Sequence, residues 1–212
     1  MIFPDIKEMK FAILDLDGTI IDSMPAWKNV TRDYLASLGI KAAADIRDKV
    51  KRLTSEENAA YLQSEYGVNK AADEIIAGIH SVIEDQYRNQ IAMKKSGILI
   101  LSELKARGIP FCAATSTDRV LMEACLKRLG ILDDFAFILT CSEVGKGKYH
   151  PDIFYRAMER IGGSLADTVV FEDALHCVKT AKDAGFKVVG VYEEVDAEDF
   201  PAVAKICDHI IK

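Results

Sequence analysis

The sequence predicts an α/β protein with a doubly wound parallel sheet and an all-helical domain inserted after the first strand. From Gly97 onward, apolar runs of strand length alternate with amphipathic helical stretches, as in strands joined by crossover helices. Residues 42–93 contain no convincing strand and indicate two or three helices. Three of the apolar runs end in polar side chains, which is typical of a sheet whose carboxyl edge forms a ligand site.

The first predicted strand is the apolar run Phe11–Leu14, which stops at Asp15, Asp17 and Gly18. A buried parallel strand delivers its carboxyl end to the edge where α/β proteins bind ligands, so the two acids are expected to face a crevice. Gly18 lets the backbone turn tightly beside a ligand. A lone Asp-Gly pair would more often cap a turn, but other strands of this chain end in the same way.

The inserted domain begins with a helix. Pro25 suits the first turn of this helix, apolar residues follow at helical spacing, and Gly39 ends it. A further helix starts near Ser55 and stops at Gly67. The predicted domains are an α/β core of residues 1–21 and 92–212 and a helical insert of residues 22–91.

Glycine and proline mark the element boundaries of the core. Gly108 ends one helix, Pro151 begins another, and Gly185 ends a third. The predicted strands after the first are Ile109–Ala114, Phe135–Leu139, Thr168–Phe171, Lys187–Tyr192 and a short terminal strand near His209–Ile211.

Polar side chains follow the predicted strands at three places. Thr115 and Ser116 follow the second strand, and Glu172 and Asp173 follow the fourth, which repeats the pattern at Asp15. In an open parallel sheet such ends meet at the switch point, where successive connections leave the first strand in opposite directions. The sequence therefore predicts one crevice lined by carboxylates and hydroxyl groups.

Composition limits the partners. The chain has 212 residues, a net charge of −6 and a pI near 5.3, which disfavours a nucleic-acid-binding protein and favours small substrates. It has no leader-like start and no apolar span of 18 residues, so we expect a cytoplasmic protein without a membrane partner. We also expect the protein to be either a monomer or a weak homodimer. The five cysteines lack C-x-x-C spacing and are predicted to be buried free thiols.

Four motifs carry a family resemblance. The stretch Asp15–Thr19 resembles the first motif of the haloacid dehalogenase-like superfamily, most of whose members transfer phosphoryl groups through an aspartyl-phosphate. Thr115 corresponds to the second motif and Lys148 to the third, while Glu172 and Asp173 correspond to the fourth. The motifs occur in the family order, and the helical insert lies where the superfamily has its cap. The resemblance implies a Rossmann-like core with a helical cap domain.

The resemblance also implies a role for each residue. Asp15, with an unperturbed pKa of about 4, is ionised at pH 7 and acts as the nucleophile. Asp17 protonates the leaving group and later activates water. The superfamily's dehalogenases lack an acid at this second position, so Asp17 favours phosphate esters as substrates. Thr115 and Ser116 bind the phosphoryl oxygens, and Lys148 binds the phosphate and neutralises charge in the transition state.

A metal ion is expected because an anionic nucleophile beside Glu172 and Asp173 would otherwise repel an anionic phosphate. Magnesium is the implied ion. By resemblance, Asp15 and Asp173 are ligands through their side chains, and Asp17 is a ligand through its backbone carbonyl. Glu172 binds either directly or through water. Asp173 could equally cap the helix that follows it, a role compatible with metal binding.

The third motif departs from the family at one position. Tyr149 stands where relatives commonly have proline, although the lysine and the helix start remain in place. Lys146, two residues before Lys148, is not assigned a role in the motif. The alternative to a catalytic role for Lys148 is an ordinary solvated lysine on the surface. The four histidines show no paired metal-ligand spacing and are interpreted as surface or structural residues: His80, His150, His176 and His209.

The predicted function is a Mg-dependent phosphatase for a small phosphorylated metabolite, with a cap that closes over the core. A phosphosugar mutase is the alternative, and a non-catalytic binding protein on the same scaffold is a weaker one. β-Phosphoglucomutase-like relatives bind a second phosphate through a cap arginine, and the nearest alignment puts Ser55 at that position, although Arg52 lies three residues away. Their cap histidine has no counterpart between Asp22 and Leu38.

Overall fold

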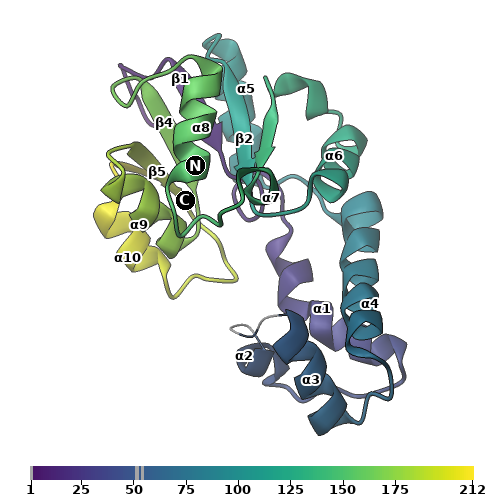
Figure 1. The fold of residues 1–212 in the computed structure, drawn as a ribbon. Helices are drawn as coiled ribbons and strands as arrows, with labels where there is room; N and C mark the ends of the chain where they lie inside the picture. The colour runs from purple at the N-terminus through teal and green to yellow at the C-terminus, as the bar shows by residue number, and fades with distance from the viewer. Residues whose placement is uncertain (1, 51–52, 54) are drawn as a thin grey trace. The chain divides into compact units, whose positions relative to one another are not determined.

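The computed structural model describes residues 2–50, 53 and 55–212. The chain forms two compact units, one made of Met1–Met24 with Ile91–Lys212 and the other of Pro25–Gln90. The first unit holds a sheet with helices on both faces, and the second is helical (Figure 1). The predicted fold class is therefore confirmed.

The sheet of the first unit has six parallel strands in the order β3-β2-β1-β4-β5-β6. The connections leave β1 first toward β2 and later toward β4, so the switch point lies at the carboxyl end of β1. Leu14, the last residue of β1, pairs with Ala113 of β2 and Phe171 of β4. The strands are β1 Phe11–Leu14, β2 Phe111–Thr115, β3 Ile138–Thr140, β4 Thr168–Glu172, β5 Lys187–Val191 and β6 His209–Ile211.

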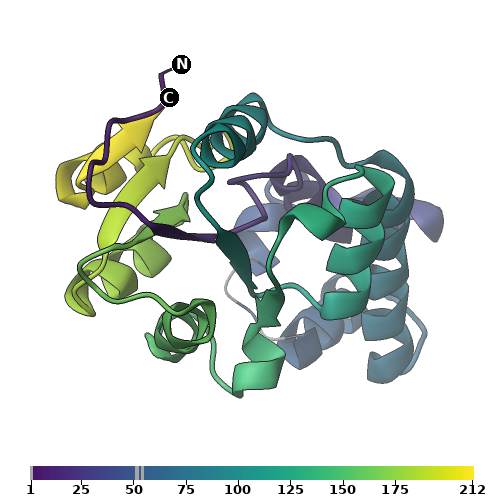
Figure 2. The same ribbon diagram turned by 90° about the horizontal axis from the view of Figure 1, so that it is seen from above.

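Helices cover both faces of this sheet. Figure 2 shows α8 and α9 on one face and α5 on the other. On the first of these faces, Ile13 and Val170 of the sheet pack with Phe154 of α8 and Val178 of α9. The helices are α5 Lys95–Ala106, α6 Arg119–Arg128, α7 Cys141–Val144, α8 Asp152–Ile161, α9 Leu175–Asp183 and α10 Phe200–Ile206, with a 3₁₀ turn, η2, at Leu132–Asp134.

The second unit contains α1 Met24–Ser37, which begins one residue before it, α2 Ile46–Val50, α3 Ser55–Tyr66, α4 Ala72–Asp85 and the π-helical turn η1 Gln86–Gln90. The predicted stops at Gly39 and Gly67 both have positive φ, 74° and 64°, as helix-ending glycines commonly do. The core of this unit is formed by Tyr34, Leu35, Ile46, Ala59, Leu62, Val68 and Ile75. Lys51 and Arg52, including the arginine weighed above as a second phosphate ligand, lie outside the described residues.

Some boundaries differ from those predicted. The third strand begins at Ile138 because Phe135, which was predicted to start it, lies just after the 3₁₀ turn and packs edge-on against Phe111 at 5.1 Å between ring centroids. Helix α5 begins at Lys95, two residues before Gly97. A Cβ at Gly97 would overlap the carbonyl oxygen of Ile20, so glycine lets this first helical turn approach the chain after β1.

Two remaining predictions concern cysteines and membranes. Within the described part of the chain all five cysteines are free thiols, but Cys141 and Cys207 are only half-buried, contrary to the prediction for these two. Among the same residues, no helix combines the length and apolar content needed to cross a bilayer.

Candidate active site

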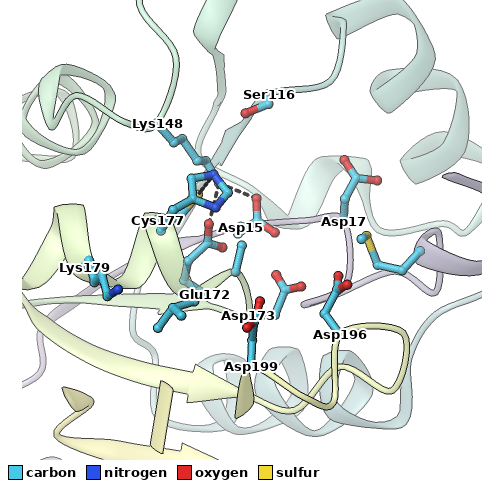
Figure 3. Close-up of a pocket in the computed structure, with 14 residues that line it drawn as sticks. Asp15, Asp17, Ser116, Lys148, Glu172, Asp173, Cys177, Lys179, Asp196 and Asp199 are labelled. Carbon is cyan, nitrogen blue, oxygen red and sulfur yellow. Dashed lines mark hydrogen bonds and ion pairs between the residues drawn. The ribbon is translucent and has the colours of Figure 1, made fainter. Parts of the chain in front are cut away.

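The carboxyl ends of β1, β2 and β4 open onto one cavity of about 450 Å³ in the first unit. The amide of Asp15 continues the sheet by donating to the carbonyl of Phe171 at 3.0 Å, which brings the end of β1 beside Glu172. Figure 3 shows the predicted site residues that line this cavity: Asp15, Asp17, Ser116, Lys148, Glu172 and Asp173.

Three carboxylates of the cavity form a cluster that could hold a metal ion. Asp15, Glu172 and Asp173 each offer an oxygen, and these atoms lie within 4.8 Å of one another. Glu172 Oε2 is buried and has no hydrogen-bond partner among the described residues, so the cluster has an unsatisfied acceptor. Carboxylate oxygens are the ligands that Mg²⁺ and Ca²⁺ prefer. The donor set therefore fits a hard divalent cation.

The electrostatics of the cluster also favour a cation. Burial, followed by the neighbouring charge of Asp15, raises the pKa of Glu172 to about 8. Burial and the charges of Glu172 and Asp15 likewise raise the pKa of Asp173 well above its ordinary value. Without metal, the cluster therefore retains a proton near neutral pH, because three ionised carboxylates would repel one another.

Lys148 lies against this cluster. Its buried ammonium group forms an ion pair with Asp15 and contacts Glu172 Oε1 at 3.3 Å. Burial opposes its charge, but Asp15 and Glu172 outweigh that effect and raise the pKa of Lys148 well above its ordinary value. Lys146 instead pairs with Asp152 at 2.9 Å on the surface. Lys146 is therefore the solvated surface lysine, and Lys148 is not.

The carboxylate of Asp17 lies apart from this three-residue cluster and is held by two hydroxyl groups. Ser23 Oγ donates to Asp17 Oδ1 at 2.6 Å, and Thr117 Oγ1 donates to Asp17 Oδ2 at 2.7 Å. Ser23 is fully buried and Thr117 is nearly so. These two hydrogen bonds orient the carboxylate of Asp17, and each of its oxygens has a second lone pair that can take part in proton transfer.

The residues after β2 differ in their exposure. Thr115 is fully buried, and its hydroxyl accepts a hydrogen bond from the amide of Thr117 at 3.1 Å. Ser116 lines the cavity, and its hydroxyl lies 3.4 Å from Cys141 Sγ. Of the two hydroxyl groups predicted to bind phosphate, the structure thus brings Ser116 to the cavity, while Thr115 is buried and does not line the cavity.

The turn after β1 holds Asp173. Gly18 has a φ of 80°, and a Cβ there would overlap the Asp173 carboxylate. Thr19 Oγ1 donates to Asp173 Oδ1 at 3.0 Å. The alternative role of Asp173 as a helix cap is wrong, because α9 begins at Leu175 and Ala174 is its N-cap residue.

Comparison with known proteins identifies the family. The model of the haloacid dehalogenase-like hydrolases matches residues 9–185, which include the four motifs and the helical unit. The chain belongs to this family.

Relatives and solved structures agree with that membership. A bifunctional riboflavin kinase/FMN phosphatase of Arabidopsis thaliana is 29% identical over 88% of this chain and 49% of its own length, so the chain spans about half of that protein. The β-phosphoglucomutase of Bacillus subtilis is 29% identical over 86% of this chain and 83% of its own. A Thermotoga maritima structure, proposed to be a β-phosphoglucomutase, has a TM-score of 0.84 at 22% identity and covers 96% of this chain and 94% of that one.

This haloacid dehalogenase-like site contains residues that sequence reasoning missed. His176, interpreted above as a surface or structural residue, lines the cavity and stacks on the exposed ring of Tyr149 with 4.4 Å between ring centroids. The sequence feature that could have indicated this position is that His176 lies in the first turn of the helix after Asp173. The other lining residues of this kind come from α9 and from the segment before α10, namely Cys177, Lys179, Asp196 and Asp199.

Proposed function

We propose that this chain is a phosphoric monoester hydrolase that uses Asp15 as nucleophile and Mg²⁺ as cofactor on a small phosphorylated metabolite. The observation that carries this proposal is the position of Asp15, which directly follows β1, pairs with the Lys148 ammonium group and lies in one cluster with the carboxylates of Glu172 and Asp173. Membership of a hydrolase family supports the reaction class, as does similarity to about half of a bifunctional riboflavin kinase/FMN phosphatase.

The proposed reaction has two steps. Asp15 attacks phosphorus, the ester P–O bond breaks, and Asp17 gives a proton to the leaving oxygen. Water then attacks the phosphorus of the aspartyl-phosphate while Asp17 takes a proton from that water. The bond between phosphorus and the Asp15 oxygen breaks, which releases phosphate and restores the Asp15 carboxylate. Lys148 neutralises the phosphoryl charge, and Ser116 and Thr115 donate hydrogen bonds to its oxygens.

Asp15, Glu172 and Asp173 would hold the metal ion through their side chains, and Asp17 through its backbone carbonyl. Bound Mg²⁺ supplies positive charge beside the transferred phosphoryl group. We further propose that the helical unit Pro25–Gln90 is the cap domain that selects the leaving group.

The test of the proposed function is a screen of phosphorylated sugars, nucleotides and organic acids, followed by release of inorganic phosphate with and without Mg²⁺. We expect Mg²⁺-dependent hydrolysis of at least one monophosphate. A complete lack of turnover across the panel, in protein that binds Mg²⁺, would favour the non-catalytic alternative.

Removal of metal is expected to abolish activity. Excess chelator should stop phosphate release, and added Mg²⁺ should restore it, whereas the larger Ca²⁺, which tolerates more ligands, should support little turnover. The affinity for Mg²⁺ should also fall by up to about tenfold for each pH unit below pH 8, because the metal must displace the proton that the raised pKa of Glu172 retains. Titration calorimetry at pH 6.5 and 8.0 measures this effect. Undiminished activity in chelator would contradict the metal proposal.

We expect hydrolysis of phosphosugars without isomerisation. A mutase must hold a bisphosphate in two orientations, and this chain has Ser55 at the position of the relatives' cap arginine and no cap histidine between Asp22 and Leu38. Water should therefore reach the aspartyl-phosphate. Phosphorus NMR of β-glucose 1-phosphate with a bisphosphate activator measures both reactions. The similarity to a β-phosphoglucomutase keeps the mutase as the alternative, and glucose 6-phosphate forming faster than free phosphate would favour it.

A further inference from the structure

Lys94, the residue directly before helix α5, forms a buried ion pair with Glu193. The proposed reaction gives this ion pair no role. The Lys94 ammonium group donates to the carbonyl oxygen of Gly18, to that of Tyr192 at 2.9 Å, and to the carboxylate of Glu193. Only 13% of the Lys94 side chain and 5% of the Glu193 side chain are exposed. The three acceptors match the three donors of one ammonium group.

The contact with Gly18 lies one residue from the hydroxyl group that holds Asp173. Thr19 donates to Asp173 Oδ1 at 3.0 Å, and the carbonyl oxygen of Thr19 accepts a hydrogen bond from Ser96 Oγ at 3.2 Å. The carbonyl groups of two consecutive loop residues, Gly18 and Thr19, are therefore both held from the beginning of α5. These contacts fix the backbone from which the Thr19 hydroxyl reaches Asp173.

Other contacts of the same segment limit its movement. The backbone amide of Lys94 donates to the carbonyl of Ile20 at 2.9 Å, and the missing Cβ of Gly97 leaves room for that same carbonyl. Glu193 is itself fixed, because its Oε1 accepts the amide of Val195 at 2.9 Å. Lys94 therefore connects the loop after β1 to the segment after β5.

We propose that Lys94, held by Glu193, is a positioning residue that fixes the Gly18–Thr19 segment so that Thr19 orients the Asp173 carboxylate for the metal ion. This inference rests on the metal site of the proposed function. Groups that support a metal ligand in this way typically change metal affinity by about 10- to 100-fold when they are removed.

The test is a charge-balanced double variant, Lys94→Met with Glu193→Gln, which deletes the contact with Gly18 and leaves the net charge of the site unchanged. We expect its affinity for Mg²⁺ to fall about tenfold or more, measured by titration calorimetry on metal-free protein. We also expect kcat to fall more than KM rises. Because calorimetry needs no turnover, the absence of phosphatase activity would count against the proposed function and not against this inference.

The matched control is Lys182→Met with Asp208→Asn, which removes another partly buried ion pair of the same unit, with side-chain exposures of 29% and 35%. This pair lies outside the cavity lining, so we expect unchanged Mg²⁺ affinity. If the Lys94 variant unfolds at a lower temperature but binds Mg²⁺ like the wild type, its role is structural and the proposal is overturned.

Two further variants test the route and guard against misfolding. Thr19→Val removes the hydroxyl that contacts Asp173, and we expect the Lys94 and Glu193 changes to weaken Mg²⁺ binding little further in that background. A fully additive loss would contradict the route through Thr19. Lys94→Arg keeps the positive charge beside Glu193, but its rigid planar fork directs its donors differently from the compact ammonium group that meets three acceptors here. We expect weakened Mg²⁺ binding, and unchanged binding would overturn the proposal.

Discussion

Replacing Asp15 with Asn is expected to abolish phosphate release while leaving the fold intact. Asparagine has nearly the shape of aspartate, but its neutral amide cannot attack phosphorus. Asp15 is only 7% exposed and is paired with Lys148, so its carboxylate is held in one place. Loss of a catalytic nucleophile can lower kcat by about 10⁶-fold, which would put the variant below detection. Phosphate release and circular dichroism measure the two parts of this prediction.

Asp22→Asn is the matched control, because Asp22 is exposed and lies seven residues further along, outside the cavity lining. We expect this variant to retain activity. Asp17→Asn should lower turnover by about 100-fold or more, since both proton transfers of the proposed reaction depend on Asp17. With a good leaving group it should also accumulate phosphorylated protein, detectable by mass spectrometry, which Asp15→Asn cannot do. Near wild-type activity in Asp15→Asn would contradict its assignment as nucleophile.

The central strands could be predicted from the sequence because they are buried on both faces. Phe11–Leu14 is an unbroken apolar run and Thr168–Phe171 is apolar after its first residue, and each is followed at once by an acid. In the structure β4 pairs with β1 in parallel register, which brings Asp15 beside Glu172, but the apolar runs alone did not specify that these two strands are neighbours. The acids at the strand ends could nevertheless be recognised from the sequence as a group at one edge of the sheet.

Contacts between distant loops could not be predicted in this way. Lys94 and Glu193 are 99 residues apart, and neither has a periodic pattern or a motif that points to the other. Their pairing depends on how the segment before α5 and the segment after β5 converge, which no local rule specifies. Helix α7 was missed for another reason. It is a single turn, and its stability comes from Thr140 and Glu143, each of which accepts a hydrogen bond from the other's backbone amide.

Lys148→Met is expected to lower kcat by about 10² to 10³-fold, the effect of removing one donor that stabilises charge in a transition state. It should also destabilise the metal-free protein. Methionine fills similar space but leaves Asp15 and Glu172 without their buried cation, and breaking a buried ion pair costs about 3–5 kcal/mol. Mg²⁺ should restore part of this stability, because it supplies positive charge to the same carboxylates.

Lys146→Met provides the control within the same loop. Lys146 carries the same charge two residues earlier, but its side chain is 52% exposed and it pairs with Asp152, so its loss should change activity and stability little. Initial rates at saturating Mg²⁺ and thermal unfolding with and without Mg²⁺ compare the two variants. If Lys146→Met lost turnover while Lys148→Met kept it, the lysine that meets the phosphate would be Lys146. A drop in stability without a drop in kcat would limit Lys148 to holding the carboxylates together.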